Sequence, residues 1–242
     1  LGIVSLKGDN ARSFLQGQMT CDINQITEHR FRQGAFCNLK GRILALATVF
    51  YWDGFKLILP KDLLKDTVST LEKAAQLSRV AMYEEERFSI QGLYSLNSSL
   101  EKNQASSAAG QCALGLDRYR SMIISTPPAS SPALSYGSLG WHLLGLKNGD
   151  IEIYPSTQGA FLPHRLDLHK TTYIAFDKGC YKGQEIIART HYRAKLKHQL
   201  SFFVIEQTEL FPQQKIYTLD KKHKWNKGKT QLYDLYDEEI EE

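Results

Sequence analysis

Residues 34–60, GAFCNLKGRILALATVFYWDGFKLILP, constrain the fold more than any other part of the chain. Two apolar runs in this segment are joined by Asp53-Gly54, and a shorter run before them ends at Lys40-Gly41. Asp-Gly between apolar runs is a strong hairpin signal, because both residues tolerate the positive φ angles of a tight turn. We therefore expect three consecutive antiparallel strands, so the core must contain a sheet.

A helix is expected directly after these strands, because four apolar residues recur there at helical spacing: Leu64, Val68, Leu71 and Ala75. The order of strands and then a helix is expected once more. Residues 87–96 and 117–126 have the apolar pattern of strands, and a helix is predicted around 141–146 that stops at Asn148-Gly149.

The remaining segments set the boundaries of this body. Residues 97–111 are small and polar, and we expect a loop or an interrupted helix there. Two recurrences of strands followed by a helix favour two α+β layers over a doubly wound parallel sheet. We assign residues 1–205 to one body. Residues 206–242 are too few for a further domain of usual size and form a short remnant or tail.

Composition and motif patterns exclude several classes of protein. The chain has 242 residues, 42% hydrophobic and 23% charged, as in globular proteins, and its net charge of +4 permits an anionic partner. No run approaches the ~18 apolar residues of a membrane span, so no membrane contact is expected. Glycine patterns of nucleotide-binding loops and zinc-site patterns are absent. The four cysteines form no CxxC pair and indicate reduced thiols, a cytoplasmic location and no metal site.

The segment 176–190, FDKGCYKGQEIIART, holds a candidate for chemistry. Cys180 follows one glycine and precedes another, and glycines allow a ligand or a strand to approach closely. Lys178 and Lys182 flank the cysteine, and their charges favour the reactive thiolate. The alternative is a buried, inert thiol in a tight turn, which is the common state of cysteine. These residues alone leave both interpretations open.

Four other features also have two interpretations each. CNLKGRI (37–43) is a second such cluster or a plain hairpin turn. Trp141 is a core residue or a wall on which a flat heterocycle stacks. RTHYRAKLKH (189–198) is interpreted as a strand whose alternating basic residues face an anionic ligand or RNA, or simply water. His164 is expected to be a structural or a surface residue.

Taken together, these pieces resemble the YgfZ family. The octapeptide KGCYKGQE (178–185) is similar to the family signature K-G-C-Y-x-G-Q-E, and its companions follow the family order: FLQGQMTCDI, CNLKGRI, a tryptophan before the turn at Gly149, GAFLP and ARTHYR. The resemblance covers roughly residues 1–205. Proteins of this family bind folate and are related to the glycine-cleavage T protein, an aminomethyltransferase.

The resemblance implies an α+β fold of two ferredoxin-like subdomains around a central folate channel, with a truncated or absent C-terminal β-barrel. It implies tetrahydrofolate or a related folate as cofactor. The implied function is that of a folate-binding auxiliary protein, rather than an enzyme, that supports iron–sulfur enzyme maintenance and tRNA modification. Iron–sulfur client enzymes are the implied protein partners.

The resemblance also assigns residues. Cys180 is the functional thiol. Trp141 falls on a tryptophan associated with folate, and further cofactor contacts are expected from the signature, the segment after it and the Lys-Gly turn: Lys178, Tyr181, Gln184, Glu185, Arg189 and Lys40. The chain departs from the family at Asn38, where an acidic residue is common. Lys147 replaces a glutamate suited to the pterin edge, and His164 stands where Gln or Glu is usual.

Two rival functions remain. The first is a tetrahydrofolate-dependent aminomethyltransferase, which needs a carboxylate to assist proton transfer beside the folate nitrogen. The cysteine signature and Asn38 argue against that enzyme. The second is a tRNA-binding module built on residues 189–198 and 220–230, for which a steep salt dependence of binding is the minimum requirement.

Overall fold

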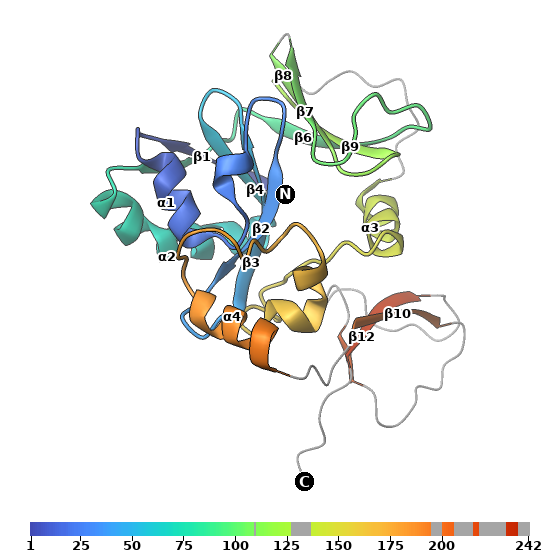
Figure 1. The fold of residues 1–242 in the computed structure, drawn as a ribbon. Coiled ribbons are helices and arrows are strands. Elements are labelled where there is room, and N and C mark those ends of the chain that lie inside the picture. Colours follow the sequence, from blue (N-terminus) through green and yellow to red (C-terminus); the bar gives the residue numbers. More distant parts are fainter. Residues whose placement is uncertain (109, 127–136, 195–199, 206–214, 218–230, 237–242) are drawn as a thin grey trace.

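The computed structural model of the chain describes residues 1–108, 110–126, 137–194, 200–205, 215–217 and 231–236 (Figure 1). It is a mixed fold of helices and antiparallel sheets. The first sheet has five strands in the order β2-β3-β4-β1-β5, and every neighbouring pair is antiparallel. Its strands are β1 (Gly2–Lys7), β2 (Arg32–Cys37), β3 (Ile43–Tyr51), β4 (Phe55–Leu59) and β5 (Ala81–Glu84).

The second sheet has four antiparallel strands in the order β6-β9-β8-β7. These are β6 (Ser89–Tyr94), β7 (Ala105–Ala108), β8 (Gln111–Gly115) and β9 (Arg120–Ser125). A third sheet pairs β10 (Leu200–Ile205) with β12 (Gln231–Tyr236), and β12 with β11 (Lys215–Tyr217). This sheet crosses the boundary expected at residue 205, and the assignment of residues 206–242 to a remnant of a barrel stays a prediction.

Helices flank the sheets. The α-helices are α1 (Ala11–Gln18), α2 (Lys61–Leu77), α3 (Gly137–Lys147) and α4 (Gln184–Arg193), and the short 3-10 helices are η1 (Ile23–Gln25), η2 (Pro163–Leu166) and η3 (Leu168–Lys170). In Figure 1 the second sheet (green) and α4 (orange) lie on opposite sides of the first sheet (blue). None of the helices in the described part of the chain is both long and apolar enough to cross a bilayer.

The first sheet is buried on both faces, which explains its nearly continuous apolar strands. Side chains alternate between the two faces of a strand. Val4 and Leu6 of β1 point into a core with α1, α2 and residues 153–187, whereas Ile3 packs with Phe50 against the second sheet. Each fully buried side chain of this type contributes about 1.5–3 kcal/mol.

Most of the expected elements are confirmed. The hairpin turn at Asp53-Gly54 has positive φ at both residues, and Lys40-Gly41 lies in the turn between β2 and β3. The apolar stripe of α2 faces the core, and α3 ends before Gly149, which has a φ of 76°.

Two expectations are wrong. Residues 97–111 contain β7 and the start of β8, because the backbone of Ala-Ser-Ser-Ala pairs with β8 at the sheet edge without needing large side chains. The basic segment after the signature is not a strand: its described part up to Arg193 belongs to α4. Gly183, with φ 84°, turns the chain into this helix, so Arg189 and Arg193 share a helix face.

Candidate functional site

Lys178 anchors the signature loop to the end of α1. Its ammonium donates hydrogen bonds to the carbonyl oxygens of Gln16 (2.8 Å), Met19 (2.7 Å) and Cys21 (2.8 Å). An ammonium has three donors, so all of them are used within the protein. Burial lowers the pKa of Lys178 to about 8, although nearby Cys21 and Asp22 act in the opposite direction. The structure therefore gives Lys178 a role in holding the loop.

The next signature residues also hold the loop. Tyr181 is buried in the main core, and burial raises the pKa of its hydroxyl. Its backbone N–H donates to the side-chain oxygen of Gln184 (3.3 Å), and the N–H of Lys182 donates to the carbonyl oxygen of Gly17 (3.0 Å). Side chain and backbone thus fix the path of the chain on both sides of Tyr181.

Two glycines bring the signature and the CNLKGRI turn together. Gly183 has φ 84°, and a Cβ atom there would lie 2.5 Å from the carbonyl oxygen of Asn38 and 3.0 Å from the Cα of Gly41. Gly41 in turn lies against Ile186 and Ile187 of α4. Both glycines are needed for this close approach. CNLKGRI is therefore a hairpin turn and also the surface on which α4 rests.

The side chain of Asn38 shapes that turn. Its oxygen accepts hydrogen bonds from the backbone N–H of Lys40 (2.9 Å) and of Arg42 (3.0 Å). A carboxylate oxygen would accept the same two bonds. The departure from the family at this position is thus compatible with the same turn.

The four cysteines divide into three buried thiols and one exposed thiol. Cys180 is exposed, whereas burial raises the pKa of each of the other three to about 12: Cys21, Cys37 and Cys112. A thiol with such a pKa is protonated and unreactive at neutral pH. The alternative of a buried thiol at Cys180 is therefore excluded, and its chemical role stays a prediction.

Trp141 on α3 lies over the second sheet. A Cβ atom on Gly92 of β6 would lie 2.5 Å from its ring, so the glycine allows the indole to lie flat on the strand. The guanidinium of Arg120 is 5.7 Å from the centre of the indole ring. The ring is only partly buried. Trp141 therefore packs against the second core while part of its surface stays accessible, and its role as a stacking wall stays a prediction.

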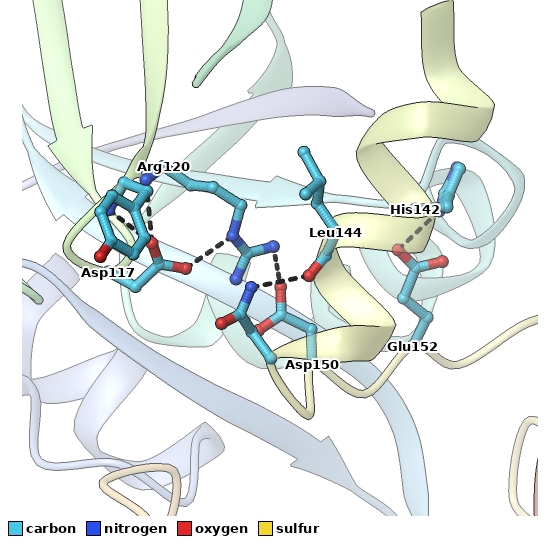
Figure 2. A network of polar contacts seen from close by, with 8 residues as sticks. Asp117, Arg120, His142, Leu144, Asp150 and Glu152 are labelled. Carbon is cyan, nitrogen blue, oxygen red and sulfur yellow. Dashed lines mark hydrogen bonds and ion pairs between the residues drawn. The ribbon is translucent and has the colours of Figure 1, made fainter. Parts of the chain in front are cut away.

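Arg120 organises a polar network beside Trp141 (Figure 2). Its side chain is 2% exposed and donates to Asp117 Oδ2 (2.6 Å) and Asp150 Oδ2 (2.7 Å). Burial acts to raise the pKa of Asp117, but hydrogen bonds from Arg120 and two backbone N–H groups outweigh it and lower the pKa. The pair of carboxylates compensates the buried cation.

A second cluster of polar side chains lies at the other side of α3 (Figure 2). Glu152 Oε1 is 2.9 Å from His142 Nδ1, and the hydroxyl of Tyr154 donates to the other oxygen of Glu152. Burial acts to raise the pKa of Glu152, but these two partners hold it below its usual range. Glu152 is therefore a carboxylate at neutral pH.

Tyr173 connects this network with the signature loop. Burial raises the pKa of its hydroxyl, and the carboxylates of Asp150 and Glu152 raise it further. The carbonyl oxygen of Tyr173 accepts a hydrogen bond from Thr20 Oγ1 (2.7 Å), next to the carbonyls that bind Lys178. Tyr173 thus lies between the carboxylates of Asp150 and Glu152 and the segment around Thr20 that binds Lys178.

The other predicted site residues lie on an outer face. Glu185 and Arg189 of α4 are exposed, and so is Lys40 in the turn on which α4 rests. Their assignment to the cofactor stays a prediction.

Sequence reasoning missed a cluster of three histidines. The ring of His164 is stacked on that of His169, with centroids 4.8 Å apart, and lies 5.7 Å from His191, which stacks on Phe176 at 3.8 Å. His164 is 1% exposed, and neither of its ring nitrogens has a hydrogen-bond partner in the described part of the chain. Burial lowers the pKa of His164 to about 4, and repulsion from His169 and His191 contributes to the shift.

These histidines form no metal centre in this arrangement. Across the described ranges, no three His, Cys, Asp or Glu side chains are placed so that they could hold a metal ion. The cluster packs α4 and Phe176 against η2 and η3. His164 is thus structural, as expected, and the signal that could have revealed its partners is the recurrence of His at 169 and 191.

Comparisons with known proteins agree on one family and one fold. No family model matches the chain. The tRNA-modifying protein YgfZ of Colwellia psychrerythraea is 30% identical over 219 residues, which cover 82% of this chain and 68% of the relative. The protein of the same name from Buchnera aphidicola is 27% identical, covering 92% and 77%. The glycine cleavage system aminomethyltransferase T of Bartonella henselae has the same fold, with a TM-score of 0.60 and 13% identity over 98% of this chain and 75% of that one.

Proposed function

The chain belongs to the YgfZ family, and on this premise we propose that it is a folate-binding auxiliary protein in tRNA modification that acts through the thiol of Cys180. Its relatives are tRNA-modifying proteins, and its structural neighbour is an aminomethyltransferase. The proposal includes two ferredoxin-like subdomains around a folate channel, a cytoplasmic location, and iron–sulfur enzymes as clients.

The observation that carries the proposal is the difference between Cys180 and its neighbours in the signature. Lys178, Tyr181, Gly183 and Gln184 are all engaged in holding the loop, as described above. Cys180, in contrast, has an exposed thiol that projects from this frame. A thiol held in one place by a rigid support is suited to attack or exchange with a partner.

The surface beside Trp141 is suited to a pterin. The partly exposed indole offers a flat surface for stacking. Asp150 is 46% exposed, and only its Oδ2 is engaged among the described residues, so Oδ1 can accept from the amino and amide N–H groups of a pterin. Asp150 lies three residues after Lys147, which is exposed and replaces the family glutamate. We assign the role of that glutamate to Asp150.

Titration with tetrahydrofolate tests the ligand part of this proposal. Tryptophan fluorescence should change and saturate in the native protein, and the change should vanish in Trp141→Phe, which leaves the other two tryptophans in place. Asp150→Asn should bind about tenfold more weakly, since it loses a charge-assisted hydrogen bond. Absence of a saturable change in the folded protein contradicts folate binding.

Complementation of a strain that lacks the family member tests the thiol. Cys180→Ala should fail to restore tRNA modification, whereas Cys112→Ala, which removes a buried thiol of the second sheet, should restore it. Full rescue by Cys180→Ala would remove the thiol from the proposal. Circular dichroism is the control that both variants are folded.

The rival aminomethyltransferase lacks its acid–base group at Asn38. A primary amide has no pKa near neutral pH and does not act as a general acid or base, and the Asn38 oxygen is occupied by two backbone N–H groups. An assay with aminomethylated lipoyl carrier protein and tetrahydrofolate decides between the two. Turnover would replace our proposal with the enzyme.

A contact with tRNA is supported by the outer face of α4. Arg189 and Arg193 continue the helix face of Ile186, which lies against Gly41. We propose that they form one basic surface with the exposed Lys40 and Arg42. Tyr192 is 70% exposed. Cations with an exposed aromatic ring suit an RNA backbone and an unstacked base. Residues 195–199 and 218–230, which hold the other lysines of this hypothesis, lie outside the described residues.

Binding of tRNA should weaken steeply with salt, and Arg189→Ala with Arg193→Ala should reduce the slope. Binding that does not depend on salt, or no binding, dismisses this contact.

A further inference from the structure

A cavity of about 300 Å³ lies beside the signature loop and is not part of the site described above. Its walls come from three places: the α2 helix, the strands β2 and β3, and the end of α1 with the signature loop. Its polar lining includes Asp66, Ser69 and Thr70 of α2, Gln18, Gln158 and Lys182. The volume is at the lower end of the range of roughly 300–1,000 Å³ for small-molecule sites.

Among the described residues, three polar side chains of this cavity are free for a ligand, whereas Thr67, Thr70 and Gln158 each donate to a backbone carbonyl. Within the described ranges, the side chains of Lys182, Asp66 and Gln18 make no hydrogen bond or ion pair. Lys178, four residues before Lys182, uses all three of its donors. The cavity thus offers a cation, an anion and an amide to a bound molecule.

The two opposite charges do not meet each other. Lys182 on the signature loop and Asp66 on α2 both line the cavity, yet they form no ion pair. The space between them is open to a molecule that carries both a negative and a positive group. Charge-assisted hydrogen bonds at both ends would fix its orientation.

The floor of the cavity is apolar. It is formed by Phe36, Leu44 and Leu71, with the protonated thiol of Cys37 beside them. We infer that the cavity is a binding site for a neutral α-amino acid with an apolar side chain, whose carboxylate pairs with Lys182 and whose ammonium pairs with Asp66.

The site is tied to the signature loop but independent of the folate proposal. Lys182 occupies the variable position of the signature, and its N–H is bound to Gly17, so an occupant of the cavity contacts the loop two residues from Cys180. None of the lining residues belongs to the network around Trp141. Loss of folate binding would leave this site unaffected.

Titration of the full chain with unlabelled L-leucine tests the inference. The binding is monitored by NMR of the ¹³C-labelled leucine methyl groups of the protein. The methyl signals of Leu44 and Leu71 should shift and saturate. N-acetyl-L-leucine, which lacks the ammonium, and L-leucinamide, which lacks the carboxylate, should each bind about tenfold more weakly, because each loses one charge-assisted contact.

Variants assign each end of the ligand. Asp66→Asn should weaken leucine about tenfold but leave N-acetyl-L-leucine unchanged, and Lys182→Met should weaken leucine but leave L-leucinamide unchanged. Lys40→Met removes an exposed cation of the neighbouring turn and should leave leucine binding unchanged. Asp66 is exposed on a helix, so Asp66→Asn decides the question if Lys182→Met does not fold.

Three outcomes overturn the inference. No saturable shift of Leu44 or Leu71 means that the cavity holds only water. Equal binding of N-acetyl-L-leucine means a simple anion site at Lys182, and equal binding of L-leucinamide means a simple cation site at Asp66.

Discussion

The signature loop and the α3 network use buried charge in opposite ways. In the loop, three backbone carbonyls occupy all the donors of Lys178, and the thiol of Cys180 is exposed to solvent. In the network, Arg120 is buried between carboxylates that keep part of their surface accessible. The signature loop therefore holds one sulfur atom in a fixed position. The α3 network presents carboxylate groups that can still bind a ligand.

This difference implies that a substitution of Lys178 in the signature loop mainly destabilises the protein, whereas a substitution in the α3 network mainly affects ligand binding. Lys178 donates to three carbonyl oxygens, whereas Arg120 pairs with two carboxylates. The largest loss of stability is therefore expected when Lys178 is replaced.

Lys178→Met should lower the free energy of unfolding by about 4 kcal/mol, because three partly buried carbonyls lose their donor at more than 1 kcal/mol each. The contact of its ammonium with the ring of Tyr181, 4.9 Å from the centroid, is lost as well. Urea denaturation measures the change, with exposed Lys40→Met as the control. Equal midpoints for the two variants would contradict the anchoring role.

Acid should destabilise the side of the molecule that holds α4. The pKa of His164 is about 4 in the folded protein and about 6.5 when unfolded, so the unfolded state binds the proton more readily. Stability is therefore complete above pH 6.5 and is lost as pH falls towards 4. The loss should be about 3 kcal/mol between pH 7 and pH 4.

His164→Gln should flatten this pH dependence, because it removes the titrating ring that faces His169 and His191. His29→Gln, which changes an exposed histidine, should keep it. Chemical denaturation at a series of pH values makes the comparison. An unchanged slope in His164→Gln would show that other groups cause the acid sensitivity.

Arg120→Met should cost about 2 kcal/mol, less than Lys178→Met, because Asp117 and Asp150 are 21% and 46% exposed and water can solvate them. Its effect on tetrahydrofolate affinity should be larger than that of Lys178→Met, since Trp141 and Asp150 both lose their neighbour. Parallel urea and fluorescence titrations give the two effects. If Lys178→Met weakened tetrahydrofolate binding more than Arg120→Met, the proposed difference between the signature loop and the α3 network would be wrong.

Asn38→Asp should change stability by less than about 0.5 kcal/mol, because a carboxylate accepts the same two backbone N–H groups. Asn38→Ala should cost about 1 kcal/mol, because it leaves both donors without this partner. Thermal unfolding of the two variants provides the measurement. A large cost for Asn38→Asp would show that the turn requires the amide.

The parts that sequence predicts well are those determined by local pattern. The hairpin at Asp53-Gly54 and the apolar stripe of α2 follow from residues that lie next to each other in the chain. The motif order was also sufficient to identify the family. Local pattern is weaker after the signature, where basic residues at 189 and 193 fit a strand alternation and a helix face equally well.

The parts that sequence does not predict depend on contacts between distant segments. Lys178 looks like a ligand for an anion until the carbonyls of residues 16, 19 and 21 are placed around it, about 160 positions away. The exposure of Cys180 and the meeting of Gly183 with Gly41 have the same origin. Asp150, which takes the place of the family glutamate in our proposal, lies outside every motif.

Alkylation of the native protein tests the central claim most directly, which is that the signature frame presents one reactive thiol. With iodoacetamide and peptide mass spectrometry, Cys180 should be labelled quickly in the folded protein. The other three cysteines should react only after unfolding, because they are buried with pKa values of about 12. Protection of Cys180, or labelling of Cys21 or Cys37 at a comparable rate in the native state, would contradict the account.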